Sequence, residues 1–294
     1  MGNMLVGCGQ VSWPPHTPEE QILAEIAQAG YVGAPAFARG GRTAQETVAL
    51  WARYGLRPAP GYLGADFWRP EQCAQICERA RQEARFMREV GCTELYVAAG
   101  GFESYVTASG LHRKALAGHV GLADGMSDAE WRQFADTLNR VGEITLSEGV
   151  RSCFHNHVGS VIETGAEFER LLELTDPALV FLGPDTGHLA WGGVDPVAFC
   201  RAYADRIYTI HIKDVHLDVV ERGRQAGWDY DTFCRNGVFT ELGAGDVDFP
   251  ALFAALCAAG FAGWVIVEID VPERPTPLES ITVSREYLRR IGVG

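Results

Sequence analysis

Lysine, long apolar runs and paired cysteines are all scarce in this sequence of 294 residues. Lys114 and Lys213 are its only lysines, and its net charge is −13. Because an acidic surface repels the phosphate backbone that Lys and Arg neutralise in nucleic-acid complexes, we expect no nucleic acid as a partner. No run reaches the ~18 apolar residues of a membrane-spanning helix, and the first residues lack the basic and apolar regions of a signal peptide. We therefore expect no membrane association.

The eight cysteines are scattered, and no two of them form a CxxC pair. They do not indicate a disulfide framework, so we expect a reducing, cytoplasmic location. Cys73 and Cys77 lie four residues apart in an expected helix and could share a metal ion. Two such ligands without a third nearby are more often packed thiols.

Short apolar runs of strand type alternate with amphipathic segments along the whole chain. This alternation predicts parallel strands joined by helical crossovers, and eight units favour a single (β/α)8 barrel domain over residues 1–294. The expected strands are 4–11, 31–37, 56–62, 94–99, 150–155, 179–184, 207–212 and 264–269.

Signals for the starts and ends of helices lie between these runs. Capping boxes begin at Thr17, Ser127 and Thr164, and each opens a segment of helical apolar spacing. Glycines at five expected helix ends predict left-handed C-caps, at Gly30, Gly55, Gly91, Gly149 and Gly260.

A doubly wound sheet that binds a dinucleotide is the alternative fold. It would need G-x-G-x-x-G after the first strand. Gly7 and Gly9 supply the first two glycines, but Ser12 stands at the third position. The barrel remains the favoured fold.

Two connections, 100–126 and 216–247, are too long for plain turns. Both follow the carboxyl ends of expected strands, where barrel enzymes place their sites, so we expect them to wall the pocket from above. Their aromatic residues could shelter a small ligand or simply anchor the loops to the barrel. These residues are Phe102, Tyr105, Trp228, Tyr230 and Phe233.

Ionisable residues stand at the carboxyl ends of the last four expected strands. They are His155, Asp185, His211 and Glu268, and in a barrel such ends are neighbours around one rim. Two imidazoles and two carboxylates suit a divalent metal with open positions for substrate oxygens. Each residue alone has a simpler explanation, such as a core histidine, a helix N-cap or a surface carboxylate. Their joint placement predicts a metal site.

Lys213 alternates with His211 on the seventh expected strand, so both side chains should face the barrel interior. A buried ammonium must be paired or must bind a substrate oxygen, and Asp185 or Glu268 could pair with it. A functional role is favoured over a purely structural ion pair.

Several motifs of this chain resemble the xylose isomerase-like barrel superfamily of sugar isomerases, epimerases and dehydratases. They are Asp185-Thr-Gly-His188, His211-Ile-Lys-Asp214, the stretch Gly243 to Phe249, and Val267-Glu268. Within the superfamily, His155-Asn-His157 and Ser12-Trp13 most resemble the myo-inosose (2-keto-myo-inositol) dehydratases. The resemblance spans nearly the whole chain and is strongest over 150–290.

The resemblance implies a divalent metal, Mn²⁺ or Co²⁺ before Zn²⁺ or Mg²⁺, held by Glu, Asp, His and Glu. Asp185, His211 and Glu268 match the last three ligands, whereas His155 stands where the first Glu is usual. Epimerases of the superfamily use both glutamates to move a proton between the faces of the substrate, so His155 favours a one-base elimination. The second strand, 33–37, also lacks the acidic residue that many relatives carry there.

The activity implied by the resemblance is a metal-dependent lyase that dehydrates a keto-polyol such as 2-keto-myo-inositol. Glu268 or His157 would remove the proton next to the ketone, and His157, His188 or Lys213 would protonate the departing hydroxyl. The expected partner is thus a keto-sugar or keto-polyol, and the sequence leaves open whether copies form a homo-oligomer.

Three alternatives to this activity remain. The nearest is a sugar epimerase or isomerase, or a lyase of 3-keto-glycosides. The endonuclease IV branch of the superfamily is disfavoured by the acidic charge. A non-catalytic sugar-binding barrel is disfavoured because three of the four usual metal ligands are present.

Overall fold

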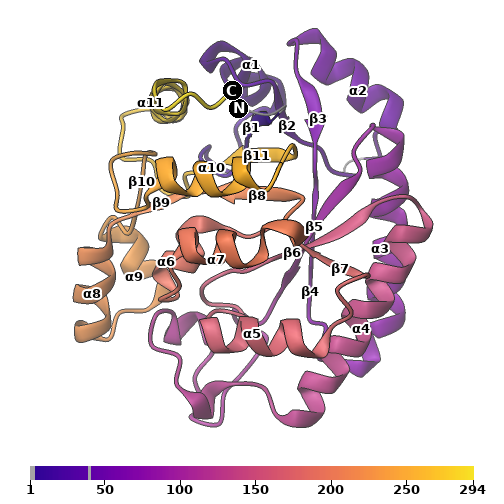
Figure 1. Cartoon of the computed structure of the whole chain (residues 1–294), viewed down its shortest axis with the longest axis vertical. Coiled ribbons are helices and arrows are strands. Elements are labelled where there is room, and N and C mark those ends of the chain that lie inside the picture. Colours follow the sequence, from indigo (N-terminus) through magenta and orange to yellow (C-terminus); the bar gives the residue numbers. More distant parts are fainter. Residues whose placement is uncertain (1–3, 39–40) are drawn as a thin grey trace.

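The computed structural model describes residues 4–38 and 41–294 of the chain. Its central strands lie inside an outer layer of helices (Figure 1). The strands are β1 (Leu5–Cys8), β2 (Gly33–Pro35), β3 (Arg57–Ala59), β4 (Tyr62–Ala65), β5 (Glu94–Ala99), β6 (Arg151–His155), β7 (Val180–Leu182), β8 (Thr209–Ile212), β9 (Asp214–Val215), β10 (Phe239–Thr240) and β11 (Trp264–Val267). The α-helices are α1 (Glu19–Ala29), α2 (Ala44–Arg53), α3 (Cys73–Glu89), α4 (Asp128–Ser147), α5 (Gly165–Leu174), α6 (Thr186–Trp191), α7 (Pro196–Tyr203), α8 (Leu217–Ala226), α9 (Tyr230–Arg235), α10 (Phe249–Ala258) and α11 (Pro277–Arg290).

Two parallel sheets make up the barrel wall, in the orders β3-β2-β1-β11-β8 and β4-β5-β6-β7. The chain passes from the first sheet to the second within the third expected strand, where Pro60 and Gly61 separate β3 from β4. On the other side, the parallel bridges Leu182–Ile207 and Asp185–His211 join β7 to β8. The two sheets are thus joined by these bridges on one side and by the chain between β3 and β4 on the other, and the arrangement confirms the expected (β/α)8 fold.

Local signals for helix ends are mostly confirmed. Ser127 and Thr164 cap α4 and α5 with both reciprocal hydrogen bonds of a capping box. The box expected at Thr17 is wrong, because α1 follows Pro18, which makes no side-chain capping bond and suits the helix entry through its fixed φ. The five glycines expected at helix ends all have a positive φ, between 69° and 87°.

The two long connections contact each other. The connection after β5 contains short 3₁₀ turns and no α-helix, whereas α8, α9 and β10 lie in the connection after β8 and project to one side of the barrel (Figure 1). Lys114 Nζ lies 2.9 Å from Asp231 Oδ2, and Arg224 donates a hydrogen bond of 3.0 Å to the carbonyl of Gly118. The two segments therefore support one another. None of the described helices has the length and apolarity to cross a membrane.

A buried ion pair fastens the first of these connections to α5. The guanidinium of Arg113 is fully buried and donates to both carboxylate oxygens of Glu167, at 2.7 and 3.0 Å. Glu167 is also the acidic residue of the α5 capping box. Since a buried charge is tolerated only while its partner is present, loss of either side chain leaves the other uncompensated.

Replacement of Arg113 by Met should therefore lower the free energy of unfolding by about 3–5 kcal/mol. Urea denaturation followed by circular dichroism measures the change. The matched control is Arg81→Met, because Arg81 pairs with Glu78 on the exposed face of α3 and such a pair contributes under about 1 kcal/mol. Equal losses in the two variants would contradict the anchoring role of Arg113.

Candidate active site

A cavity of about 340 Å³ opens at the carboxyl ends of the barrel strands. His155 ends β6, His211 lies in β8 and Glu268 directly follows β11, so three of the four strand ends expected to converge line this one space. The lining residues are Val11, Pro35, Phe37, Pro60, Tyr62, Tyr96, His155, His157, His211, Lys213, Glu268 and Asp270.

His155, Asp185 and His211 form a buried cluster of potential metal ligands, here called the inner cluster. One nitrogen or oxygen of each residue lies within 4.8 Å of the others. Glu268 borders the cluster, with its Oε2 3.2 Å from Nδ1 of His211. The Nδ1 of His155, the Oδ2 of Asp185 and both ring nitrogens of His211 are buried and make no hydrogen bond among the described residues, although Glu268 and Lys213 lie within ion-pair distance of His211 Nδ1 and Asp185 Oδ2. Convergent, unsatisfied donors of this kind fit a divalent metal ion.

Asp185 is held so that one of its oxygens stays free. Its Oδ1 accepts the backbone N–H of His188 at 3.0 Å and caps α6. Asn156 fixes its backbone, because Asn156 Oδ1 accepts the N–H of Asp185 at 3.0 Å. The cap uses one carboxylate oxygen, and the other remains in the inner cluster.

Burial controls the protonation of these side chains. Desolvation lowers the pKa of His155 well below its usual value and lowers the pKa of His157 to about 4. Both imidazoles are therefore neutral near pH 7 and keep the lone pair that a metal ligand or a general base needs. Desolvation also raises the pKa of Asp185 to about 6, although Lys213 opposes the shift.

Lys213 has three carboxylates around its ammonium. Its Nζ lies 2.6 Å from Asp270 Oδ1 and 3.5 Å from both Asp185 Oδ2 and Glu268 Oε2. Burial alone would lower the pKa of Lys213, but the carboxylates raise it above its usual range. Burial likewise favours a higher pKa for Glu268, but His211 and Lys213 hold it below its usual range.

Asp270 is a site residue that sequence reasoning missed as the partner of Lys213. It belongs with His157 and His188 to a second group of potential ligands, here called the outer cluster, whose donor atoms also lie within 4.8 Å of one another. The signal was available, because Asp270 follows Glu268 by two residues and such positions share one side of an extended segment. His188 is fully buried and does not line the cavity.

His157 has a fixed tautomer. Its Nδ1 lies 2.7 Å from the carbonyl oxygen of Val158, and because a carbonyl can only accept, Nδ1 carries the proton. The Nε2 atom therefore keeps its lone pair. Phe102 and Tyr230 pack on the His157 ring, with centroid distances of 4.9 and 5.9 Å.

The two long connections thus cover the ring of His157 with Phe102 and Tyr230. None of the described residues that line the cavity comes from 101–126 or 216–247. The expectation that these segments form the pocket wall is therefore wrong for the lining itself, which comes from strand ends and from shorter loops. Anchoring explains Tyr105, which packs on Trp68 at 5.5 Å, and the fully buried Phe233.

Two tyrosines that sequence reasoning did not single out lie beside the imidazoles. The rings of Tyr96 and His211 have centroids 4.0 Å apart, and Tyr62 contacts His155 edge-on at 5.4 Å. The hydroxyl of Tyr96 lies 2.6 Å from that of Thr209, which fixes the ring. These contacts orient the two histidines of the inner cluster.

Two glycines allow the polar side chains to pack closely on the backbone. A Cβ at Gly9 would lie 2.7 Å from Glu268 Cγ, and a Cβ at Gly187 would lie 2.9 Å from the Lys213 stem. Gly9 thus makes room for a site carboxylate, which accounts for the glycine considered above as part of a dinucleotide motif.

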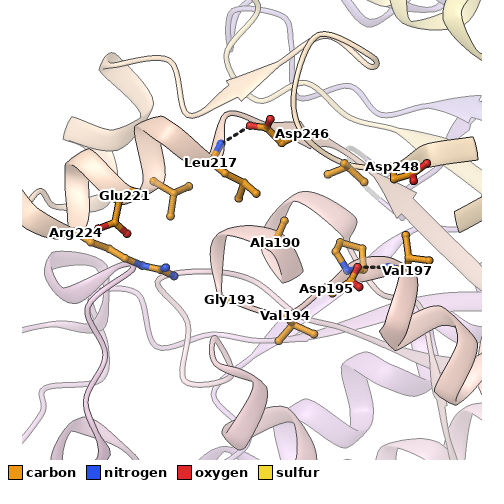
Figure 2. Close-up of a pocket in the computed structure, with 13 residues that line it drawn as sticks. Ala190, Gly193, Val194, Asp195, Val197, Leu217, Glu221, Arg224, Asp246 and Asp248 are labelled. Carbon is orange, nitrogen blue, oxygen red and sulfur yellow. Dashed lines mark hydrogen bonds between the residues drawn. The ribbon is translucent and has the colours of Figure 1, made fainter. Parts of the chain in front are cut away.

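A second cavity, of about 470 Å³, lies between the α6–α7 turn, α8 and residues 246–248 (Figure 2). Acidic side chains line it, but Asp195, Asp246 and Asp248 each accept a backbone N–H at 2.8–3.0 Å. These bonds lie at the starts of α7, α8 and α10. These three carboxylates therefore serve the helix starts, and the inner cluster lies at the first cavity.

Comparison with known proteins identifies relatives over almost the full chain. A family model described as xylose isomerase-like TIM barrel matches residues 23–291. The chain is 33% identical to an inosose dehydratase of Geobacillus kaustophilus, over 97% of this chain and 94% of the relative. It is 31% identical to the rhizopine catabolism protein MocC of Rhizobium meliloti, over 94% and 82% of the two chains.

Solved structures share the fold at lower identity. A D-allulose 3-epimerase from Methylomonas sp. has a TM-score of 0.71 at 18% identity, over 99% of this chain and 98% of that one. The probable 3-DHS dehydratase AsbF from Bacillus anthracis also has a TM-score of 0.71, at 14% identity, over 97% and 98% of the two chains. At these identities the likeness shows the fold alone.

We predict that His211→Ala and Asp185→Asn weaken Mn²⁺ binding by at least about 10- to 100-fold, because each removes a convergent donor. Metal retained after dialysis, measured by mass spectrometry, checks this. His112→Ala is the matched control, since His112 is exposed and lies outside both clusters. Unchanged metal content in both site variants would rule out the inner cluster as the metal site.

Proposed function

The chain belongs to the xylose isomerase-like TIM barrel family, and on that premise we propose that it is a metal-dependent dehydratase of a keto-polyol, with 2-keto-myo-inositol as substrate. The observation that carries the proposal is the inner cluster of unsatisfied donors beside a cavity that also presents a neutral imidazole, a carboxylate and an ammonium. The inosose dehydratase from Geobacillus kaustophilus supports this choice of substrate.

His155, Asp185, His211 and Glu268 would hold the metal in this proposal. Their mixed nitrogen and oxygen donors suit Mn²⁺ or Co²⁺, and Zn²⁺ and Mg²⁺ are the alternatives. When bound, such an ion supplies Lewis acidity that stabilises negative charge on the ketone oxygen as the neighbouring proton leaves.

His157 is the base that we assign to the reaction. It lines the cavity, its Nε2 carries a lone pair, and it lies outside the metal set to which Glu268 is committed. After taking the proton from the carbon next to the ketone, the same nitrogen can return it to the departing hydroxyl. In sum, the C–H and C–O bonds break, a C=C bond forms and water leaves, and one acid–base group serves both proton transfers.

Lys213 donates hydrogen bonds to a substrate oxygen in this scheme. Its raised pKa makes it a stable cation and a poor proton donor, so we assign it charge stabilisation and not protonation of the leaving group. His188 lies behind Lys213, with its Nε2 3.2 Å from the ammonium, and acts as a positioning residue.

The test is product analysis with 2-keto-myo-inositol and Mn²⁺. Mass spectrometry should show a product lighter by one water, and His157→Ala should lower kcat by about 10²- to 10⁴-fold because it removes the acid–base group. His112→Ala, an exposed histidine, should leave kcat unchanged. Lack of a dehydrated product, or full activity in His157→Ala, would overturn the proposal or the assigned base respectively.

An epimerase is the second candidate, favoured by the presence of two proton-accepting groups, Glu268 and His157, on different strand ends of one cavity. With His155 in place of a second metal-bound carboxylate, we expect dehydration to outrun epimerisation. His155→Glu should keep the metal and raise the ratio of epimerised to dehydrated product.

Deuterium incorporation from D₂O next to the ketone measures reprotonation in the unaltered protein. Little deuterium in recovered substrate is the expected result, because the proton leaves with the departing hydroxyl. Rapid exchange into an epimerised substrate would instead identify an epimerase.

A further inference from the structure

We propose that the ammonium of Lys213 occupies a second metal-type site, so that the barrel mouth holds one metal ion beside one tethered cation. The inner and outer clusters have the same composition of two imidazoles and one carboxylate. They also lie side by side, since the ring centroids of His155 and His157 are 6.2 Å apart and those of His155 and His188 are 6.4 Å apart. Composition alone would therefore suit two metal ions.

The two clusters differ in whether their potential metal-ligand atoms have hydrogen-bond partners. Four atoms of the inner cluster are buried without a hydrogen-bond partner, and no atom of His157, His188 or Asp270 is among the unsatisfied buried atoms of the described residues. Lys213 Nζ contacts Asp270 Oδ1 at 2.6 Å and His188 Nε2 at 3.2 Å. Because buried polar groups are almost always paired, the inner cluster needs an ion, whereas two of the three outer residues, His188 and Asp270, already contact the ammonium of Lys213.

Lys213 is held firmly in this position. Its backbone N–H donates to Thr186 Oγ1 at 2.9 Å, and the hydroxyl of Thr186 donates to its carbonyl at 2.8 Å. The stem packs against Gly187, where a Cβ would lie 2.9 Å away, and the ammonium lies 5.0 Å from the ring centroid of Phe239. A side chain fixed at both ends cannot easily swing aside for a metal ion.

The charges of the site also balance with this assignment. Asp185, Glu268 and Asp270 bring three negative charges within 3.5 Å of Lys213 Nζ. One divalent ion and one ammonium supply three positive charges, so the buried site is neutral. Two divalent ions together with the ammonium would leave an excess of two positive charges, and loss of the ammonium would lower that excess to one.

The experiment counts Mn²⁺ ions per chain by equilibrium dialysis and mass spectrometry, without substrate. The unaltered protein should bind one equivalent, and Lys213→Met, which keeps an apolar stem but removes the cation, should bind two. Lys213→Met combined with Asp270→Asn should return to one, because the outer cluster loses its carboxylate. Electron paramagnetic resonance should show coupled Mn²⁺ ions only in the single variant.

If Lys213→Met unfolds without metal, Mn²⁺ should restore its circular dichroism spectrum, because the second ion replaces the missing charge. Two equivalents in the unaltered protein, one equivalent in Lys213→Met, or a variant that stays unfolded in Mn²⁺ would each overturn the inference. These counts do not depend on turnover. Failure of the dehydratase assay would therefore not change the interpretation of the Mn²⁺ counts.

Discussion

The bridge between Asp185 and His211 is the constraint on which both the barrel and its site depend. It is one of two parallel bridges that join β7 to β8, and without them the two sheets would meet only through the break between β3 and β4. The same pairing sets a carboxylate beside an imidazole at the rim, where β7 has already ended. The same backbone pairing of Asp185 with His211 therefore closes the barrel wall and assembles the inner cluster.

Charge around Lys213 imposes the second constraint. Three carboxylates in a largely buried site would repel one another, and the ammonium between them offsets that repulsion while it also contacts His188 and Asp270 of the outer cluster. The histidines of the site are thus divided between binding a metal ion and holding the ammonium. His155 and His211 are left with free lone pairs, whereas His188 is engaged by Lys213.

The two long connections affect the site through their contacts with His157 and do not line its cavity. Arg113 and Glu167 fasten the first connection to α5, and Lys114 ties it to the second through Asp231. These connections place Phe102 and Tyr230 against the ring of His157. A base that must stay neutral and fixed in orientation gains from such apolar packing, since desolvation keeps its pKa low.

The sequence by itself determined the barrel and the positions of His155, Asp185, His211 and Glu268 at strand ends, because both follow from local periodicity and from a rim at which all parallel strands end. Only the tertiary structure decided that Lys213 pairs most closely with Asp270, that the inner cluster is unsatisfied while the outer one is filled, and that the long connections reach His157 but not the cavity lining. These outcomes depend on distances between side chains far apart in the chain, and a difference of about 1 Å between two carboxylates at the same ammonium leaves no trace in residue spacing.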